Sequence, residues 1–191
     1  MTKSILVIDS TAIKPKVAMT IAIICGTLGI ALLGGCMAQM GPGSATKIGA
    51  RAELRDPQGV SHGSVRIERV GAISRVTVNG VALPPGDHGL HIHAVGSCEG
   101  PAFASAGAHW NPDMKMHGRD NPMGAHRGDL PNLQVHTDGT GTVSFDLPGG
   151  IATLMDADGA SIVVHAAPDD FRTDPSGNSG GRIACGVFTR G

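Results

Sequence analysis

The chain has 191 residues and a formal net charge of −1, which argues against nucleic acid as a partner. Glycine is abundant, with 29 residues, proline reaches 12, and aromatic residues make up only 3% of the chain. A core with so few aromatic rings must be built from valine, isoleucine, leucine and alanine. Short strands joined by glycine- and proline-rich turns suit that supply better than long helices, so the composition favours an all-β domain.

The first 35 residues have the pattern of a secretory signal. Lys14 and Lys16 precede an apolar run over residues 17–33, which ends in the sequence LGGC at Cys36. A membrane-spanning helix is the alternative, because about 20 apolar residues would cross a bilayer. This run is slightly short and ends in small residues, so we expect residues 1–35 to be cleaved. The LGGC ending resembles the bacterial lipobox, which implies a diacylglyceryl thioether on Cys36 and a lipid anchor to a membrane.

Residues 36–49 are small, polar and flexible types, and we interpret them as a tether to a domain over residues 50–191. Cys25 would leave with the signal and Cys36 would carry the lipid, so Cys98 and Cys185 remain. An exported protein meets an oxidising compartment, which favours a disulfide between these two cysteines over two free buried thiols.

Alternating apolar and polar residues predict short strands along the domain. The expected strands cover residues 50–55, 63–70, 73–78, 87–93, 133–136, 142–147, 160–165 and 183–188. Two segments, residues 96–129 and 166–181, show no period and are rich in glycine, proline, asparagine and aspartate. We therefore predict an eight-stranded Greek-key β-sandwich or barrel with two long functional loops.

The first long loop requires an explanation, because structureless loops of over about 30 residues are abnormal in a compact domain unless something holds them. This loop carries three histidines and a carboxylate, which together make a plausible tetrahedral zinc set: His109, His117, His126 and Asp129. A bound zinc ion would account for an ordered loop.

A second group of histidines remains. His91 and His93 are two residues apart, so they point to the same face if they lie on a strand, and His165 ends a later strand. Three nitrogen ligands with room for a fourth favour copper by the affinity order of divalent metals. The residues alone thus predict two metal sites, one structural and one able to change oxidation state, and do not show whether the sites share a ligand.

Several motifs resemble the signatures of the Cu/Zn superoxide dismutases, in the same order and at the same spacing. They are HGLHIH at residues 88–93, SAGAHWNP at 105–112, HRGDL at 126–130, VVH at 163–165 and GRIACGV at 181–187. The chain is therefore identified as a member of this family over about residues 50–190. The resemblance implies a β-sandwich that converts superoxide into dioxygen and hydrogen peroxide with a copper ion and a zinc ion.

The resemblance also assigns roles to individual residues. It implies copper on His91, His93, His109 and His165, and zinc on His109, His117, His126 and Asp129, so that His109 bridges both metals. It implies a Cys98–Cys185 disulfide, an arginine beside the copper at Arg182 that attracts the anion, and a hydrogen-bonding aspartate at Asp169 that links ligands of both metals. His109 and Arg182 are thus the expected catalytic residues.

The remaining histidines are expected to have other roles: His88 as a structural residue, and His62 and His136 as exposed strand residues. Met114 and Met116 could suggest capture of copper, but we interpret them as filling the loop. Contacts between subunits differ among branches of the family, so a homodimer is left open.

The expected function is dismutation of superoxide in the periplasm or elsewhere in the cell envelope. The main alternative is a lipoprotein on the same fold that binds or delivers copper without catalysis, although the complete ligand set and Arg182 argue against it. A structural sandwich that uses only zinc and the disulfide is a third hypothesis. A zinc hydrolase is disfavoured, because the closed zinc set leaves no site for water.

Overall fold

A computed structural model describes residues 47–70, 73–147 and 151–191, which all belong to one compact unit, Pro42–Gly191. The expected signal at residues 1–35, the lipid site at Cys36 and all but the last three residues of the expected tether lie outside the described residues. In the part of the chain that is described, no helix is long and apolar enough to cross a bilayer.

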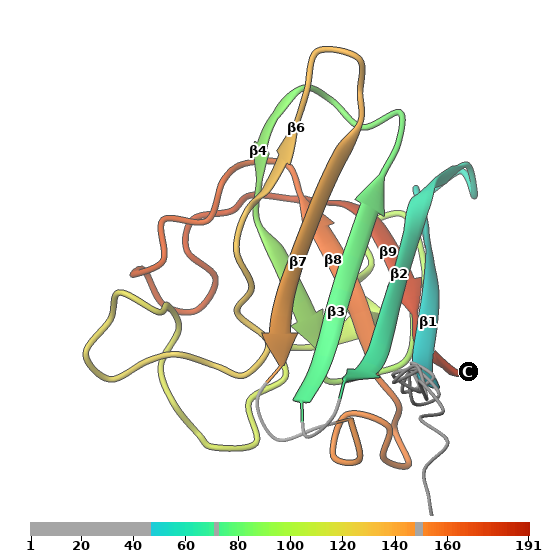
Figure 1. Ribbon diagram of the computed structural model, residues 1–191. Coiled ribbons are helices and arrows are strands. Elements are labelled where there is room, and N and C mark those ends of the chain that lie inside the picture. The colour runs from blue at the N-terminus through green and yellow to red at the C-terminus, as the bar shows by residue number, and fades with distance from the viewer. Residues whose placement is uncertain (1–46, 71–72, 148–150) are drawn as a thin grey trace, which may run out of the picture. The chain divides into compact units, whose positions relative to one another are not determined.

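The described residues form an antiparallel β fold (Figure 1). The strands are β1 (Lys47–Arg55), β2 (Ser61–Val70), β3 (Ile73–Gly80), β4 (Gly86–His88), β5 (Leu90–His93), β6 (Leu133–Val135), β7 (Gly141–Leu147), β8 (Ser161–His165), β9 (Arg182–Val187) and β10 (Thr189–Arg190). One sheet has the order β5-β8-β9-β1-β2-β3-β7, with β10 also paired to β1, and β4 pairs with β6 in a second sheet. A single 3-10 turn, η1 (Ala104–Ala106), interrupts the first long loop.

The all-β prediction is confirmed, but the described residues contain ten strands where eight were expected. The histidine segment divides at Gly89, because His88 pairs with Leu133 of β6 whereas Leu90 pairs with Val164 of β8. The last expected strand corresponds to β9, and the short strand β10 follows it. β1 begins at Lys47, three residues before the expected start. Both long loops lie where they were predicted.

The core consists of the aliphatic side chains that the composition predicted. Leu54 of β1, Ile67 of β2, Val76 of β3 and Ile162 of β8 are fully buried in one apolar cluster. Burying a side chain of this size contributes about 1.5–3 kcal/mol to stability. The core therefore fixes the register of the strands that carry the functional residues.

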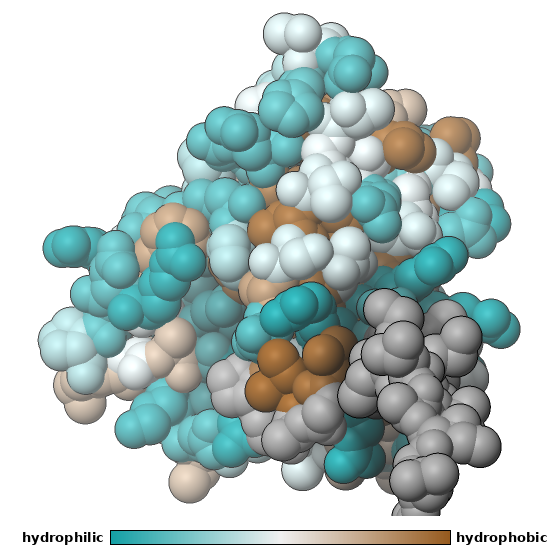
Figure 2. All heavy atoms as spheres, in the orientation of Figure 1, coloured by the Kyte–Doolittle hydropathy of each residue, from teal (hydrophilic) through white to brown (hydrophobic). Residues whose placement is uncertain are grey.

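The opposite face of the sheet is polar. Arg75 of β3 forms an ion pair with Asp146 of β7 at 2.9 Å, and Thr77 contacts Ser144 at 3.0 Å. Figure 2 shows teal and white spheres over β7, β3 and β2, with smaller brown patches among them. β2, β3 and β7 thus each have one buried and one more exposed face, as alternation in the sequence predicted, whereas β5 and β8 are buried throughout.

Candidate metal centre

Strand β5 places His91 and His93 side by side. All four of its residues are buried, and Leu90 and Ile92 join the apolar core. Because side chains alternate along a strand, His91 and His93 point to the other face, toward the long loops. β8 pairs with one edge of β5 and ends at His165.

The first long loop runs along the free edge of β5. Ile92 donates its N–H to Gly128 O at 2.9 Å and accepts a hydrogen bond from Trp110 N at 2.8 Å. Isolated bridges then set Asp129 opposite His91 and His109 opposite His93. A Cβ at Gly128 would overlap Ile92 O, so only glycine allows this close approach.

Four imidazoles converge where these elements meet. The ring centroid of His91 lies 4.0 Å from that of His109 and 4.7 Å from that of His165, and His93 lies 4.9 Å from His109. One nitrogen from each of the four rings lies within 4.8 Å of the others. The four residues expected to bind copper are therefore brought together.

Three of these rings present a nitrogen that has no hydrogen-bond partner. The other nitrogen of each ring is fixed by an oxygen: His91 Nε2 by Asp169 Oδ2 at 2.7 Å, His93 Nδ1 by Gly107 O at 2.9 Å, and His165 Nδ1 by Gly180 O at 3.1 Å. The nitrogens left over, His91 Nδ1, His93 Nε2 and His165 Nε2, are buried without a partner. Buried polar atoms without partners are rare, and three lone pairs in one place fit a bound metal ion.

Burial keeps these imidazoles neutral. Burial lowers the pKa of His93 to about 2, that of His165 to about 3 and that of His109 to about 4. Burial also lowers the pKa of His91, although its hydrogen bond to Asp169 acts in the opposite direction. Neutral rings offer free lone pairs at pH 7, as metal ligation requires.

A second cluster surrounds one carboxylate oxygen. Asp129 Oδ1 lies 3.0 Å from His109 Nδ1, 3.0 Å from His117 Nδ1 and 3.1 Å from His126 Nδ1, and the Nδ1 atoms of His109 and His126 are 3.3 Å apart. The other oxygen, Oδ2, accepts hydrogen bonds from the backbone N–H groups of Gly118 and His126 at 2.9 Å each. These contacts hold the pKa of Asp129 far below its usual range, against the effect of burial.

The spacing of these four atoms matches a tetrahedral zinc site. Zinc–nitrogen bonds of about 2.0 Å place tetrahedral ligand atoms about 3.3 Å apart, and the three separations from Asp129 Oδ1 and the one between His109 and His126 are 3.0–3.3 Å. Hydrogen bonds explain the cluster poorly, because three ring nitrogens crowd a single oxygen atom. The donor set therefore fits zinc.

His91 lies close to both clusters. It also forms a compact group with His109, His117 and Asp129, with ligand atoms within 4.8 Å of one another. However, Asp169 already holds His91 Nε2, and His126 completes the tighter set around Asp129. We therefore assign His126, and not His91, to the second cluster.

Asp169 links the two clusters. Its Oδ2 accepts a hydrogen bond from His91, while its Oδ1 lies 3.0 Å from His117 Nε2. Burial alone would lower the pKa of His117, but hydrogen bonds to Asp129 and Asp169 raise it to about 9. The carboxylate thus positions one ring from each cluster.

Two residues that sequence reasoning missed hold Asp169 in place. The Asn132 side chain donates to Asp169 O at 3.0 Å and accepts from Asp169 N at 2.9 Å. Gly177 has a φ of +64°, and a Cβ there would overlap Asp169 Oδ1. Neither residue type signals a site by itself, so only the contacts identify them.

Arg182 lies at the mouth of the histidine cluster. Its guanidinium donates to Phe103 O at 2.6 Å and to Gly107 O at 2.9 Å, and burial lowers its pKa. It lines a cavity of about 460 Å³ together with His109 and His126. Its charge also lowers the pKa values of His93 and His165, so it acts on the buried rings.

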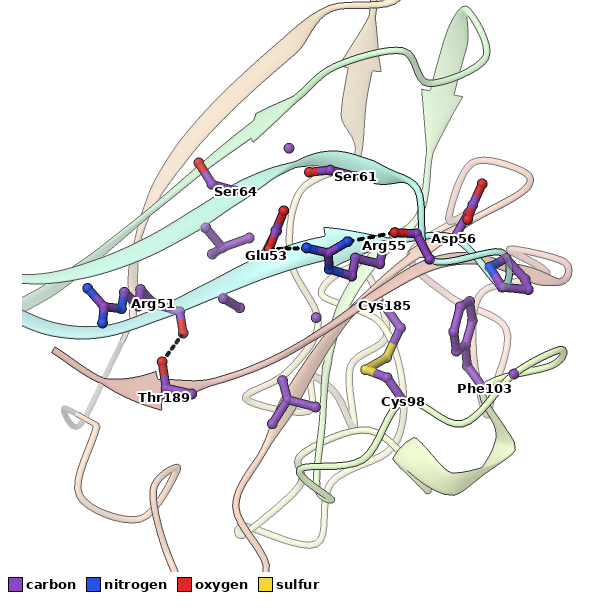
Figure 3. A pocket seen from close by; sticks show the side chains of 18 of the residues that line it. Arg51, Glu53, Arg55, Asp56, Ser61, Ser64, Cys98, Phe103, Cys185 and Thr189 are labelled. Atoms are coloured by element: carbon purple, nitrogen blue, oxygen red, sulfur yellow. Dashed lines mark hydrogen bonds and ion pairs between the residues drawn. A yellow bond between two sulfur atoms is a disulfide. The ribbon is translucent and has the colours of Figure 1, made fainter.

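The Cys98–Cys185 disulfide is present and spans 87 residues of sequence. A larger cavity, of about 980 Å³, borders it on the side of β1 and β2 (Figure 3). Arg55 pairs with Glu53 there at 2.7 Å, and no histidine lines this cavity. His109 and His126 instead line the smaller cavity beside Arg182.

The other histidines occupy structural positions. His88 is buried, with its ring nitrogens 2.7 Å from His165 O and 2.8 Å from Pro84 O, as a structural role predicts. His136 is exposed just after β6. The prediction that His62 is exposed is wrong, because its ring is half-buried in β2 and lies 3.2 Å from Asp56.

Residues 61–188 match the family model described as copper/zinc superoxide dismutase. A superoxide dismutase-like protein of Bacillus subtilis, YojM, is 44% identical over 120 residues, which are 59% of this chain and 61% of that protein. A Cu-Zn superoxide dismutase of Caulobacter vibrioides is 40% identical over 149 residues, which are 73% of this chain and 84% of that one.

Solved structures show the same similarity. A superoxide dismutase-like protein from Bacillus subtilis gives a TM-score of 0.69 at 38% identity, over 73% of this chain and 98% of that chain. A Cu/Zn superoxide dismutase from Brucella abortus gives 0.59 at 29% identity, over 72% of this chain and 98% of that one. The resemblance in the sequence motifs is thereby confirmed, and the chain belongs to the copper/zinc superoxide dismutase family, whose cofactors are a copper ion and a zinc ion.

Proposed function

We propose that this protein dismutates superoxide: two superoxide anions and two protons yield one dioxygen and one hydrogen peroxide. The observation that carries the proposal is the trio of buried imidazole nitrogens without partners, on His91, His93 and His165. With His109 they would hold copper, which supplies one-electron oxidation and reduction. His109, His117, His126 and Asp129 would hold zinc.

The two ring nitrogens of His109 have different tasks in this proposal. Its Nδ1 lies among the zinc set, 3.0 Å from Asp129 Oδ1, which leaves Nε2 for the copper set. With Nδ1 directed toward the zinc set, Nε2 would be the nitrogen of His109 that takes up a proton in one half of the cycle and releases it to the product in the other.

Arg182 would bind the anion. Hydrogen bonds to two backbone carbonyls fix the guanidinium at the cavity that His109 lines. A preorganised cation at the entrance attracts a small anion and orients it without a further change in conformation. The closed zinc set leaves no position for a catalytic water, which argues against hydrolysis.

We also propose that the protein works in the cell envelope, attached through a lipid on Cys36. The basic residues, the apolar run and the LGGC sequence support this location, and so does the disulfide, because such bonds persist in oxidising compartments. Mass spectrometry of the exported protein tests it. A mature chain that begins at lipid-modified Cys36 is expected, and an unmodified cytoplasmic chain that retains residues 1–35 would contradict it.

The main alternative is a protein that binds copper without catalysis. This alternative is considered because one relative is named only as superoxide dismutase-like. Metal analysis combined with a turnover assay separates the two. One copper, one zinc and rapid loss of superoxide are expected for the loaded, oxidised protein, whereas full copper occupancy without turnover would establish the alternative.

A further inference from the structure

Three exposed methionines lie on the loop between His109 and His126. Met114 is 90% exposed, Met123 is 64% exposed and Met116 is 40% exposed. Met155, in contrast, is partly buried against the core. Methionine usually fills gaps in apolar interiors, so packing does not explain why this residue type recurs on the surface of one loop.

The backbone holds two of these residues close together. Met116 N donates to Met123 O at 3.1 Å, which places their chain segments side by side. The Asn111 side chain donates to Lys115 O at 2.8 Å and accepts from Lys115 N at 2.9 Å, so the Met114–Lys115–Met116 segment is fixed. In Figure 2, light-brown spheres stand out among teal ones over the part of the molecule where Figure 1 draws this loop in yellow.

This group of methionines adjoins the metal centre. Met116 lines the cavity of about 460 Å³ that His109, His126 and Arg182 also line. A ligand held by Met116 would therefore stand beside His109, which belongs to the histidine cluster and lines the same cavity.

The charges at this entrance create a difficulty for a metal cation. Lys115 and Arg182 line the cavity with one carboxylate, that of Asp174. Positive charge suits an anionic substrate but repels an incoming metal ion. Thioether sulfurs are neutral and polarisable, and they select Cu(I) over zinc and other harder ions without using negative charge.

We propose that Met114, Met116 and Met123 form a surface site for Cu(I), from which the ion passes to the buried histidine cluster. Three thioethers provide a complete soft ligand set for this ion. The transfer involves no change of oxidation state. Only the transfer of copper to the histidine cluster rests on the proposed function. Binding at the methionines can be measured separately, on protein whose histidine sites are already filled.

The first test is a calorimetric titration of the copper- and zinc-loaded protein with Ag(I), a soft ion that does not change oxidation state under these conditions. The test variant is Met114→Leu/Met116→Leu/Met123→Leu, and Met155→Leu is the matched control. The wild type and the control should each bind one more Ag(I) than the triple variant, because only the triple variant lacks the three thioethers of the loop. Equal binding by all three proteins would overturn the site.

The second test measures how fast zinc-loaded, copper-free protein takes copper from a Cu(I) chelate. The triple variant should load roughly tenfold more slowly than the wild type, while final copper occupancy is the same. Equal loading rates would overturn the transfer step. Absence of superoxide turnover in the loaded wild type would instead overturn the proposed function, and the Ag(I) titration would still decide the methionine site.

Discussion

Asp169 Oδ2 lies 2.7 Å from His91 Nε2, with both side chains fully buried. Its second oxygen lies 3.0 Å from His117 Nε2, so one carboxylate sets the orientation of a ring in each metal cluster. Carboxylates that fix ligand rings in this way typically contribute about 10–100-fold to metal affinity. This contact therefore connects the loop over residues 166–181 to both metal sites.

The first prediction concerns this contact. Asp169→Asn should weaken binding of zinc and copper by about 10–100-fold, because an amide cannot accept hydrogen bonds at both positions. Competition with a chelator measures the effect. The neighbouring variant Asp170→Asn is the control, since Asp170 is exposed and bonds only within its own loop. Equal affinities for both variants would show that Asp169 does not position the rings.

The second prediction concerns Arg182. Arg182→Glu should lower the second-order rate with superoxide strongly while copper occupancy stays full, because the cation at the cavity becomes an anion. Arg190→Glu makes the same change in net charge on β10, where the side chain is exposed and bonds to Met155 O. It should leave the rate nearly unchanged.

Salt provides an independent check on Arg182. The wild-type rate should fall as ionic strength rises, since salt screens charges over about 10 Å at 0.1 M. A flat salt profile, or equal losses in both arginine variants, would contradict a guiding role for Arg182.

The third prediction concerns the disulfide. Cys98→Ser/Cys185→Ser should reduce the free energy of unfolding by roughly 4–5 kcal/mol, because the bond closes a long loop in the unfolded chain. Urea unfolding of the oxidised wild type and the variant measures the difference. A difference below about 1 kcal/mol would mean that the bond adds little to the stability of the fold.

The fourth prediction concerns pH. Burial keeps the pKa values of His93, His109 and His165 at about 2, 4 and 3, whereas the unfolded chain binds protons near pH 6.5. The three histidines therefore make their full contribution to the free energy of unfolding above about pH 6.5. This contribution is lost as pH falls toward 4, because the unfolded state then binds more protons than the folded state. His117 opposes this trend only weakly, because its pKa of about 9 keeps it protonated in the folded state throughout this range.

Metal-free protein should therefore lose roughly 1 kcal/mol of stability per buried histidine for each pH unit in this range. Unfolding in urea from pH 7 to pH 4.5 checks the slope. Stability that stays constant or rises on acidification would contradict the neutral state of the three rings.

The sequence was sufficient to predict strands and the residues that cluster, but not the contacts that orient them. Alternation along residues 90–93 placed His91 and His93 on one face, and the motif around Asp129 identified its partners. The division of the histidine segment at Gly89 was not predictable from alternation, because it depends on a change of pairing partner from β6 to β8.

The contacts that position Asp169 could not be predicted from the sequence for a related reason. Asn132 binds Asp169 across 37 residues of sequence, Gly177 lies in the same loop as Asp169, and an asparagine or a glycine in a loop commonly serves only the turn that contains it. His62 was expected to be exposed, but Asp56 and the strand around it cover the ring. Periodicity describes one strand at a time, whereas these features depend on pairs of segments.

The measurement that tests the central claim most directly is anomalous X-ray diffraction from crystals of the metal-loaded protein at the copper and zinc absorption edges. The account predicts one copper and one zinc, with His109 contacting copper through Nε2 and zinc through Nδ1. Anomalous peaks that place only one metal beside His109, or neither, would contradict it.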